Sequence, residues 1–300
     1  MQRINQAAAL NSINLIALCL LATDKHTLTR TELEQQIDFY LALQRAAPYH
    51  GQMTLPQESA GQLIDHALSL QKVQQHSDSF GQLISLTDNN AILLSYYRNN
   101  VLHLFMLPAI IACSILHQRD ISRQQLNTVV QQLYPLLQQE LFLNISSVET
   151  YCNAILQHLV AGGLVEQDGD SYRAPTQHSN GYFMLSLLAN NAEHTLQRYA
   201  MVLQLIENQG AQSRADLEKH SHDLAQRLLS LHGITAPEYY DKQLFSTLLN
   251  ALKDNGYTQT DEQSRVSATA QLHQLKDTIS HLLRNEVLQS IHSIVPTRAP

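Results

Sequence analysis

A repeat of about 92 residues constrains this chain more than any other feature of its sequence. Three segments start with Ser or Thr and carry an acidic or amide residue three positions later: Thr29–Leu33, Ser122–Leu126 and Ser213–Leu217. This pattern is typical of a helix N-terminus, where the hydroxyl accepts from the first-turn amides and the third residue reaches back. The three caps lie 93 and 91 residues apart. The spacing predicts one structural plan used three times.

The same order of elements surrounds each cap. An apolar helix is expected before each one, at Leu10–Ala22, Val101–Leu116 and Tyr199–Ile206. A second helix and a hairpin are expected after each one. The clearest hairpin follows Gly162 and Gly163, with Leu164-Val165 as a strand, Asp168-Gly169 as the turn and Tyr172 on the return strand.

Helix, capped helix, helix and two-stranded wing in about 90 residues is the plan of a winged-helix module. The sequence therefore predicts a mainly α fold with short β-hairpins, built from three tandem winged-helix-like modules. The predicted modules are residues 1–90, 91–178 and 179–300, the last ending in a C-terminal helix over about 270–292. The alternative is a helical protein in which the spacing arises by chance.

The charge distribution counts against duplex DNA as a partner. The chain carries 19 Lys and Arg against 26 Asp and Glu, for a net charge of −7. A DNA reader needs basic residues on its third helix, yet residues 58–70 and 148–161 contain none. In the third module, Lys242 and Lys253 are countered by neighbouring aspartates. No nucleic-acid partner is expected, and a transcription regulator or a protein-interaction module remains the alternative function.

The apolar segments favour buried helices over membrane spans. The run Val101–Leu116 contains His103 and Pro108 and is shorter than the roughly 20 residues that cross a bilayer. A segment lying in the membrane interface is the alternative. The run from 13 to 22 is followed by Thr-Asp-Lys rather than by a small-residue cleavage site, which disfavours a signal peptide.

Motifs of known catalytic and metal sites are missing from the sequence. There is no HExxH, GxSxG, GxxxxGK[ST] or GxGxxG, and the three cysteines form no CxxC. The densest histidine group is His220 and His222 with Asp223. The two histidines are two positions apart and so do not share a helix face, which disfavours a joint metal site. No metal site, no cofactor and no catalytic residue is therefore predicted.

Two polar clusters remain as candidate sites. In the first, Arg98, Asn99 and Asn100 follow two tyrosines where an apolar helix opens, and could hold a phosphate or carboxylate. The alternative, which we favour from the residues alone, is that Arg98 and Asn99 cap the helix or bridge modules. The second cluster, Leu231–Asp241, is a loop shaped by glycine and proline. It would face a partner domain or simply connect two helices.

Several stretches resemble the C-terminal region of the bacterial membrane-bound glycerol-3-phosphate acyltransferases. The similarity runs from the first residues to about Glu286. The stretches that carry it are Arg3–Asn5, Ala7–Ala9, Leu63–Leu68, Tyr96–His103, Leu107-Pro108, Leu133–Leu136, Glu140–Leu143, Thr195–Ala200 and Leu231–Asp241.

The resemblance implies an enzyme family that moves an acyl group from acyl-CoA or acyl carrier protein to glycerol 3-phosphate. Its signature is His-x-x-x-x-Asp, in which the histidine is the general base. None of the fifteen histidines here has Asp five positions later. The chain therefore resembles an accessory C-terminal part that lacks the catalytic domain and is inactive alone. Since the family continues upstream of Met1, a truncated or split form of the enzyme is expected.

The resemblance also implies partners and a location. The expected partner is the acyltransferase catalytic domain, in the same or a separate chain, with acyl-CoA or acyl carrier protein binding to the complete enzyme. The expected location is peripheral, on the cytoplasmic side of the bacterial inner membrane. The residues predicted to contact substrate, from charge and position, are Arg98, Asn99 and Asn100.

Overall fold

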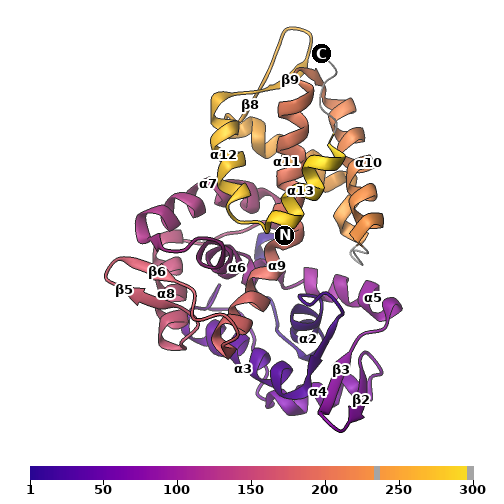
Figure 1. Cartoon of the computed structure of the whole chain (residues 1–300), viewed down its shortest axis with the longest axis vertical. Helices are drawn as coiled ribbons and strands as arrows, with labels where there is room; N and C mark the ends of the chain where they lie inside the picture. The colour runs from indigo at the N-terminus through magenta and orange to yellow at the C-terminus, as the bar shows by residue number, and fades with distance from the viewer. Residues whose placement is uncertain (233–236, 296–300) are drawn as a thin grey trace. The chain divides into compact units, whose positions relative to one another are not determined.

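The computed structural model describes residues 1–232 and 237–295, and is mainly helical with small antiparallel sheets (Figure 1). This confirms the predicted fold class at that level. The described helices are α1 (Gln2–Gln6), α2 (Ser12–Leu20), α3 (Arg30–Ala46), α4 (Ala60–Ser69), α5 (Asp88–Asn99), α6 (Leu102–His117), α7 (Arg123–Leu141), α8 (Val148–Ala161), α9 (Asn180–Gln209), α10 (Arg214–His232), the 3₁₀ helix η1 (Pro237–Tyr240), α11 (Lys242–Asp254), α12 (Ala270–Ser280) and α13 (Asn285–Ile294). The described strands are β1 (Thr27–Thr29), β2 (Gln74–Asp78), β3 (Gly81–Ser85), β4 (Ile121–Ser122), β5 (Glu166–Asp168), β6 (Ser171–Arg173), β7 (Gln212–Ser213), β8 (Thr258–Thr260) and β9 (Arg265–Ala268).

The predicted order of elements recurs three times along the chain. Each repeat also contains a strand that the sequence did not reveal, because two or three residues are too few to show an alternating pattern. These strands, β1, β4 and β7, lie directly before a capped helix and pair with the return strand of the hairpin. The three sheets have the orders β1-β3-β2, β4-β6-β5 and β7-β9-β8.

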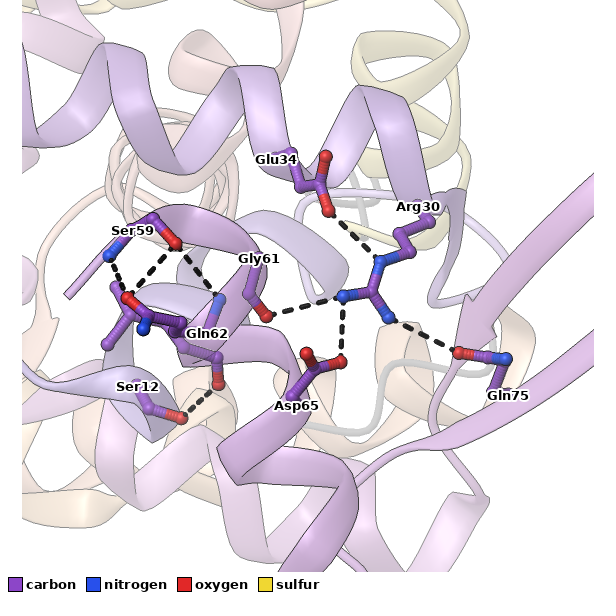
Figure 2. Close-up of polar contacts among 9 residues, drawn as sticks. Ser12, Arg30, Glu34, Ser59, Gly61, Gln62, Asp65 and Gln75 are labelled. Atoms are coloured by element: carbon purple, nitrogen blue, oxygen red, sulfur yellow. Dashed lines mark hydrogen bonds and ion pairs between the residues drawn. The ribbon is translucent and has the colours of Figure 1, made fainter.

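Side-chain caps fix where several helices begin. At the start of α3 the amide of Glu32 donates to the Thr29 hydroxyl (3.2 Å), and the amide of Thr29 donates back to the Glu32 carboxylate (2.8 Å), as predicted. The Ser213 hydroxyl accepts from the amide of Asp216 (3.1 Å). A further capping box joins Ser59 and Gln62 at the start of α4, as Figure 2 shows. Such caps offset the unpaired amides of the first turn.

One predicted strand is wrong in position. Leu164 and Val165 do not form a strand, because their amides donate to the carbonyl oxygen of Leu159 (2.9 and 3.2 Å) and so close the end of α8. Gly163 makes this possible by adopting a φ of 69°, a conformation that favours glycine. Strand β5 begins at Glu166 instead, and Gly169 (φ 57°) forms the predicted turn.

The predicted C-terminal helix over 270–292 is divided in two. Helix α12 ends at Ser280 and α13 begins at Asn285. Between them Arg284 has an extended backbone (ψ 144°), and its Nη2 donates to Oε1 of Glu193 on α9 (2.6 Å). A contact between residues so far apart in sequence leaves no trace in the local hydrophobic pattern that predicted one helix.

The chain forms two compact units, each built from separate stretches. Unit 1 comprises Met1–Arg123 and Phe142–Asn191, and unit 2 comprises Gln124–Leu141 and Ala192–Pro300. All but the first residue of α7 therefore belongs to unit 2, and α9 contributes to both. The predicted modules follow the order of elements along the sequence rather than these units. Their boundaries at 90 and 178 stay a prediction.

The core of unit 1 contains the two helices that the sequence marked as apolar. All nine residues of α2 and fourteen residues of α6 are buried, which confirms the prediction of buried helices. Pro108 lacks an amide hydrogen, so it cannot donate to the carbonyl of Leu104 in α6. That oxygen accepts instead from Nε2 of Gln44 (2.9 Å) and from the Tyr151 hydroxyl (3.4 Å). Two buried side chains thus replace the missing helical bond.

Within the described residues, no helix alone has both the length and the hydropathy needed to cross a bilayer. Helices α5 and α6 reach those values only together, and they meet at a bend of 92°.

Candidate functional site

The predicted substrate residues lie where α5 ends and α6 begins. Arg98 is buried (7% exposed), Asn99 is half-buried and Asn100 is exposed. Nε and Nη2 of Arg98 both donate to Oδ1 of Asn99 (3.3 Å each). Arg98 lies in the last turn of α5 rather than at a helix start. Its positive charge there interacts favourably with the negative end of the helix dipole. The three residues form a local cluster, with Asn100 at the surface.

The other sequence candidates have separate partners. On α10, Nδ1 of His222 donates to the carbonyl oxygen of Tyr240 (2.7 Å), whereas Nδ1 of His220 lies 3.3 Å from Oε1 of Gln212. Across residues 1–232 and 237–295, no three His, Cys, Asp or Glu side chains are placed to hold a metal ion. Part of the loop Leu231–Asp241, residues 233–236, lies outside the described residues. Within its described part, Tyr239 is fully buried, and its hydroxyl donates to Oε1 of Gln197 (3.2 Å).

A buried ion pair joins two stretches on which the family resemblance rests. Glu140 lies near the end of α7 and Arg198 lies on α9, and their side chains are only 4% and 3% exposed. Nη2 of Arg198 donates to Oε1 of Glu140. Both residues belong to unit 2. The pair therefore fastens α7 to α9 inside that unit, and it escaped sequence reasoning because 58 residues separate its members.

The surroundings of this pair leave little room for solvent. Nε of Arg198, Oε2 of Glu140 and the Tyr199 hydroxyl are buried and have no hydrogen-bond partner among the described residues. Burial, reinforced by the neighbouring Glu140 carboxylate, raises the pKa of Tyr199 well above its ordinary value. Each charge depends on the other, since an isolated buried charge is strongly destabilising.

A second feature missed from the sequence is an arginine clasp at the start of α3 (Figure 2). Nε of Arg30 donates to Glu34 (3.0 Å), and Nη2 donates both to the carbonyl oxygen of Gly61 (3.3 Å) and to the carboxylate of Asp65 (2.7 Å). Nη1 reaches Oε1 of Gln75 on β2 (3.5 Å). One guanidinium thus ties α3 to α4 and to the hairpin.

The clasp recurs in the third repeat. Arg214, which follows the cap Ser213 as Arg30 follows Thr29, donates to Glu218 (2.9 Å) and to the carbonyl oxygen of Ser246 (3.1 Å). Its Nη1 donates to Oδ1 of Asn250 (2.7 Å), four residues after Ser246, just as Asp65 stands four residues after Gly61. The signal in the sequence was present, because an arginine follows the cap in all three repeats.

The middle repeat uses its arginine differently. Nη2 of Arg123 donates to the Tyr172 hydroxyl on β6 (2.8 Å), and Nε lies 3.3 Å from the carboxylate of Asp170. Both contacts are with the hairpin, whereas Arg30 and Arg214 donate to residues of α4 and α11, the helices that follow their own. The middle repeat therefore departs from the other two at the start of its capped helix.

We expect Arg30→Gln and Arg214→Gln to lower the free energy of unfolding by similar amounts, about 1 kcal/mol each. Each loses an equivalent set of hydrogen bonds at a partly exposed position, with side chains 23% and 39% exposed. Thermal and urea denaturation of the two variants measure this. Arg173→Gln, which removes an exposed pair with Glu166, is the control and should change stability by less. A loss confined to one of the two repeats would contradict the equivalence.

One surface cavity of unit 1 has a volume of about 380 Å³ and is lined by thirteen residues. They are Gln6, Ala46, Ala47, Pro48, Tyr49, His50, Asn144, Ile145, Ser146, Ser147, Thr150, Tyr151 and Ala154. No lysine or arginine is among them, and His50 is the one side chain of the lining that can carry a positive charge.

Comparison with known sequences gives a consistent result. The profile of the family described as the glycerol-3-phosphate acyltransferase C-terminal region matches residues 1–261. A protein of Shewanella loihica named glycerol-3-phosphate acyltransferase is 41% identical over 291 residues, covering 97% of this chain and 35% of the relative. A protein of the same name from Pseudoalteromonas atlantica is 38% identical over 296 residues, covering 98% and 36%. The chain thus spans about a third of the length of these relatives.

Proposed function

The chain belongs to the glycerol-3-phosphate acyltransferase C-terminal region family, and on that basis we propose that it is the accessory C-terminal part of a glycerol-3-phosphate 1-O-acyltransferase. The complete enzyme would transfer an acyl group from acyl-CoA or acyl carrier protein to glycerol 3-phosphate, the first step of phospholipid biosynthesis. The part described here would pack on the catalytic domain, help to shape the substrate cleft, and leave the acyl transfer itself to that domain.

One observation carries this proposal. The match covers nearly the whole chain but only about a third of the relatives, while the His-x-x-x-x-Asp signature is absent from all 300 residues. A general base and its orienting carboxylate must lie together for this kind of catalysis. The catalytic pair is therefore expected in the part of the enzyme that this chain does not match.

The test is an assay of acyl transfer from palmitoyl-CoA to glycerol 3-phosphate. It compares the chain alone with a chimera in which the chain replaces the 291 matching residues of the Shewanella loihica protein. We expect no transfer by the chain alone and transfer by the chimera. Transfer by the chain alone would reveal a base among its own residues and overturn the proposal. A folded but inactive chimera would argue against an accessory role.

We further propose that each repeat is a winged-helix-like module used for packing and protein contact. Two features support this: each three-stranded sheet has the same strand order, and the first and third repeats share the arginine clasp. The third helices α4 and α8 contain no Lys or Arg, so we do not include nucleic acid among the partners. We propose a peripheral location on the cytoplasmic side of the bacterial inner membrane.

If substrate reaches this part of the enzyme, we propose that it does so at Arg98, Asn99 and Asn100. Asn100 is exposed there, and the first turn of α6 has no side-chain cap, which leaves amides suited to an anion. Arg98→Ala in the chimera should raise KM for glycerol 3-phosphate on the order of tenfold, with kcat little changed. Arg119→Ala, at an exposed position, is the control. An unchanged KM in a stable Arg98→Ala variant would exclude the site.

A further inference from the structure

Apolar residues on and beside the first helix are exposed to solvent. Helix α1 has no buried residue, and Met1 and Ile4 are 72% and 69% exposed. Ala7, directly after the helix, is exposed as well. These three residues are spaced by three and so share a helix face. A surface helix ordinarily turns such a face toward the core, so the arrangement in α1 is reversed.

Polar contacts hold α1 in this orientation. Nε2 of His103 donates to the carbonyl oxygen of Asn5 (3.1 Å), and Nδ2 of Asn5 donates to the carbonyl oxygen of Phe142 (3.4 Å). The Phe142 side chain is 46% exposed. The second contact brings α1 next to another exposed apolar residue. We call Met1, Ile4, Ala7 and Phe142 the α1 face.

This face gathers exposed apolar residues from two separate segments of the chain. Phe80, 96% exposed, stands alone at the tip of the β2–β3 hairpin, and single exposed residues are normal on protein surfaces. The α1 face combines three large exposed apolar side chains, of which Ile4 lies on the five-residue helix, Met1 lies directly before it, and Phe142 lies directly after α7. A helix so short is not stable by itself in water. A surface that covers the exposed face would add to the two polar contacts that hold this helix.

The comparisons indicate what lies next to this face in the relatives. The matched family is a C-terminal region, and its match begins at residue 1. About two-thirds of each relative lies outside the matched part, and because the family is a C-terminal region, that part is expected to precede the segment that corresponds to α1. We propose that the α1 face is the docking surface for the acyltransferase region that precedes it in the complete enzyme. This inference rests on the proposed function and specifies which surface meets the catalytic part.

Hydrogen exchange in the chain alone and in the Shewanella chimera tests the proposal. The amides of Ile4 and Asn5 in α1 donate to the carbonyl oxygen of Met1, the residue directly before the helix. We expect them to exchange at least tenfold more slowly in the chimera, where the face is covered. The amide of Phe80, which donates to Asp78 (2.8 Å), should exchange alike in both. Chain continuity through position 1 could also slow exchange, so the variants below separate the two causes.

In the chimera, Ile4→Gln combined with Phe142→Asn should restore fast exchange of α1, whereas Phe80→Gln should leave it slow. Asparagine tolerates the φ of 53° at position 142. If the double variant is unstable, the exchange of α1 can be measured in the chimera with Ile4→Gln alone, since Ile4 is well exposed. The intact Shewanella loihica protein, compared with its own matched region, gives a third measurement that does not depend on the folding of the chimera.

Each outcome decides the proposal. Fast exchange of α1 in the chimera, or slow exchange that survives Ile4→Gln, would overturn it. Protection in the chain alone that rises with concentration would assign the face to a second copy, and protection by added phospholipid vesicles would assign it to a membrane. Either would also overturn the proposal. An inactive chimera with a protected α1 face would reject the proposed function while leaving the interface, so the two failures are distinguishable.

Discussion

Replacing Arg198 with methionine should lower the free energy of unfolding by about 3–5 kcal/mol. The variant leaves the Glu140 carboxylate, 4% exposed, without its partner in a buried site. Uncompensated burial of a charge costs far more than the loss of one hydrogen bond. The loss should appear in urea denaturation followed by circular dichroism, as a lower midpoint for the part of the transition that belongs to unit 2.

Two further variants give this prediction a sharp control. Arg284→Met removes an ion pair with Glu193 whose arginine is 45% exposed, and should cost less than about 1 kcal/mol. Glu140→Leu together with Arg198→Met removes both charges and should recover most of the stability. If Arg198→Met and Arg284→Met proved equally mild, the buried pair would not fasten α7 to α9 as we infer.

Replacing Gly181 with alanine should lower the free energy of unfolding by about 2–3 kcal/mol. Gly181 is the second residue of α9, and a Cβ there would lie 2.5 Å from the carbonyl oxygen of Gly163, closer than real Cβ atoms approach. Because the obstacle is backbone, no side-chain rotation relieves it, and the end of α8 or the start of α9 must shift. In an ordinary helix interior the same change stabilises by up to about 1 kcal/mol, so the sign itself is diagnostic.

The matched control for this prediction is Gly51→Ala. No atom lies within 4 Å of the position that its Cβ would occupy, and the stability should change by no more than about 0.5 kcal/mol. Thermal denaturation of the two variants under the same conditions measures the difference. A neutral or stabilising Gly181→Ala would mean that α8 and α9 do not approach as closely as described.

Local signals in the sequence predicted the elements of this fold well. The cap at Thr29 and the turn at Gly169 depend on residues a few positions apart, and both are confirmed. The strands β1, β4 and β7 were missed because each has only two or three residues. The C-terminal helix was predicted as one because its break accompanies a distant contact of Arg284.

The residues of the candidate sites also differ in whether local sequence or only the fold reveals them. Sequence reasoning singled out Arg98 for its charge among polar neighbours, and its role stays a prediction. Arg198 lay inside a stretch noticed for resemblance, yet its partner Glu140 is 58 residues away, and only the fold brings them together. Arg30 and Arg214 could have been found from the sequence, because an arginine follows each cap at the period of the repeat.

The interleaved make-up of the two units has a consequence for the newly made chain. Residues Gln124–Leu141 belong to unit 2, but the rest of that unit starts only at Ala192. During synthesis, which proceeds from the N-terminus, α7 leaves the ribosome before any of its partners in unit 2. Unit 1 likewise has to wait for residues 142–191 before it is complete. If the ribosome stalls after residue 141 has emerged and before residue 191 has emerged, neither unit can complete its core. We therefore expect chaperone binding to the nascent chain to be greatest at these chain lengths.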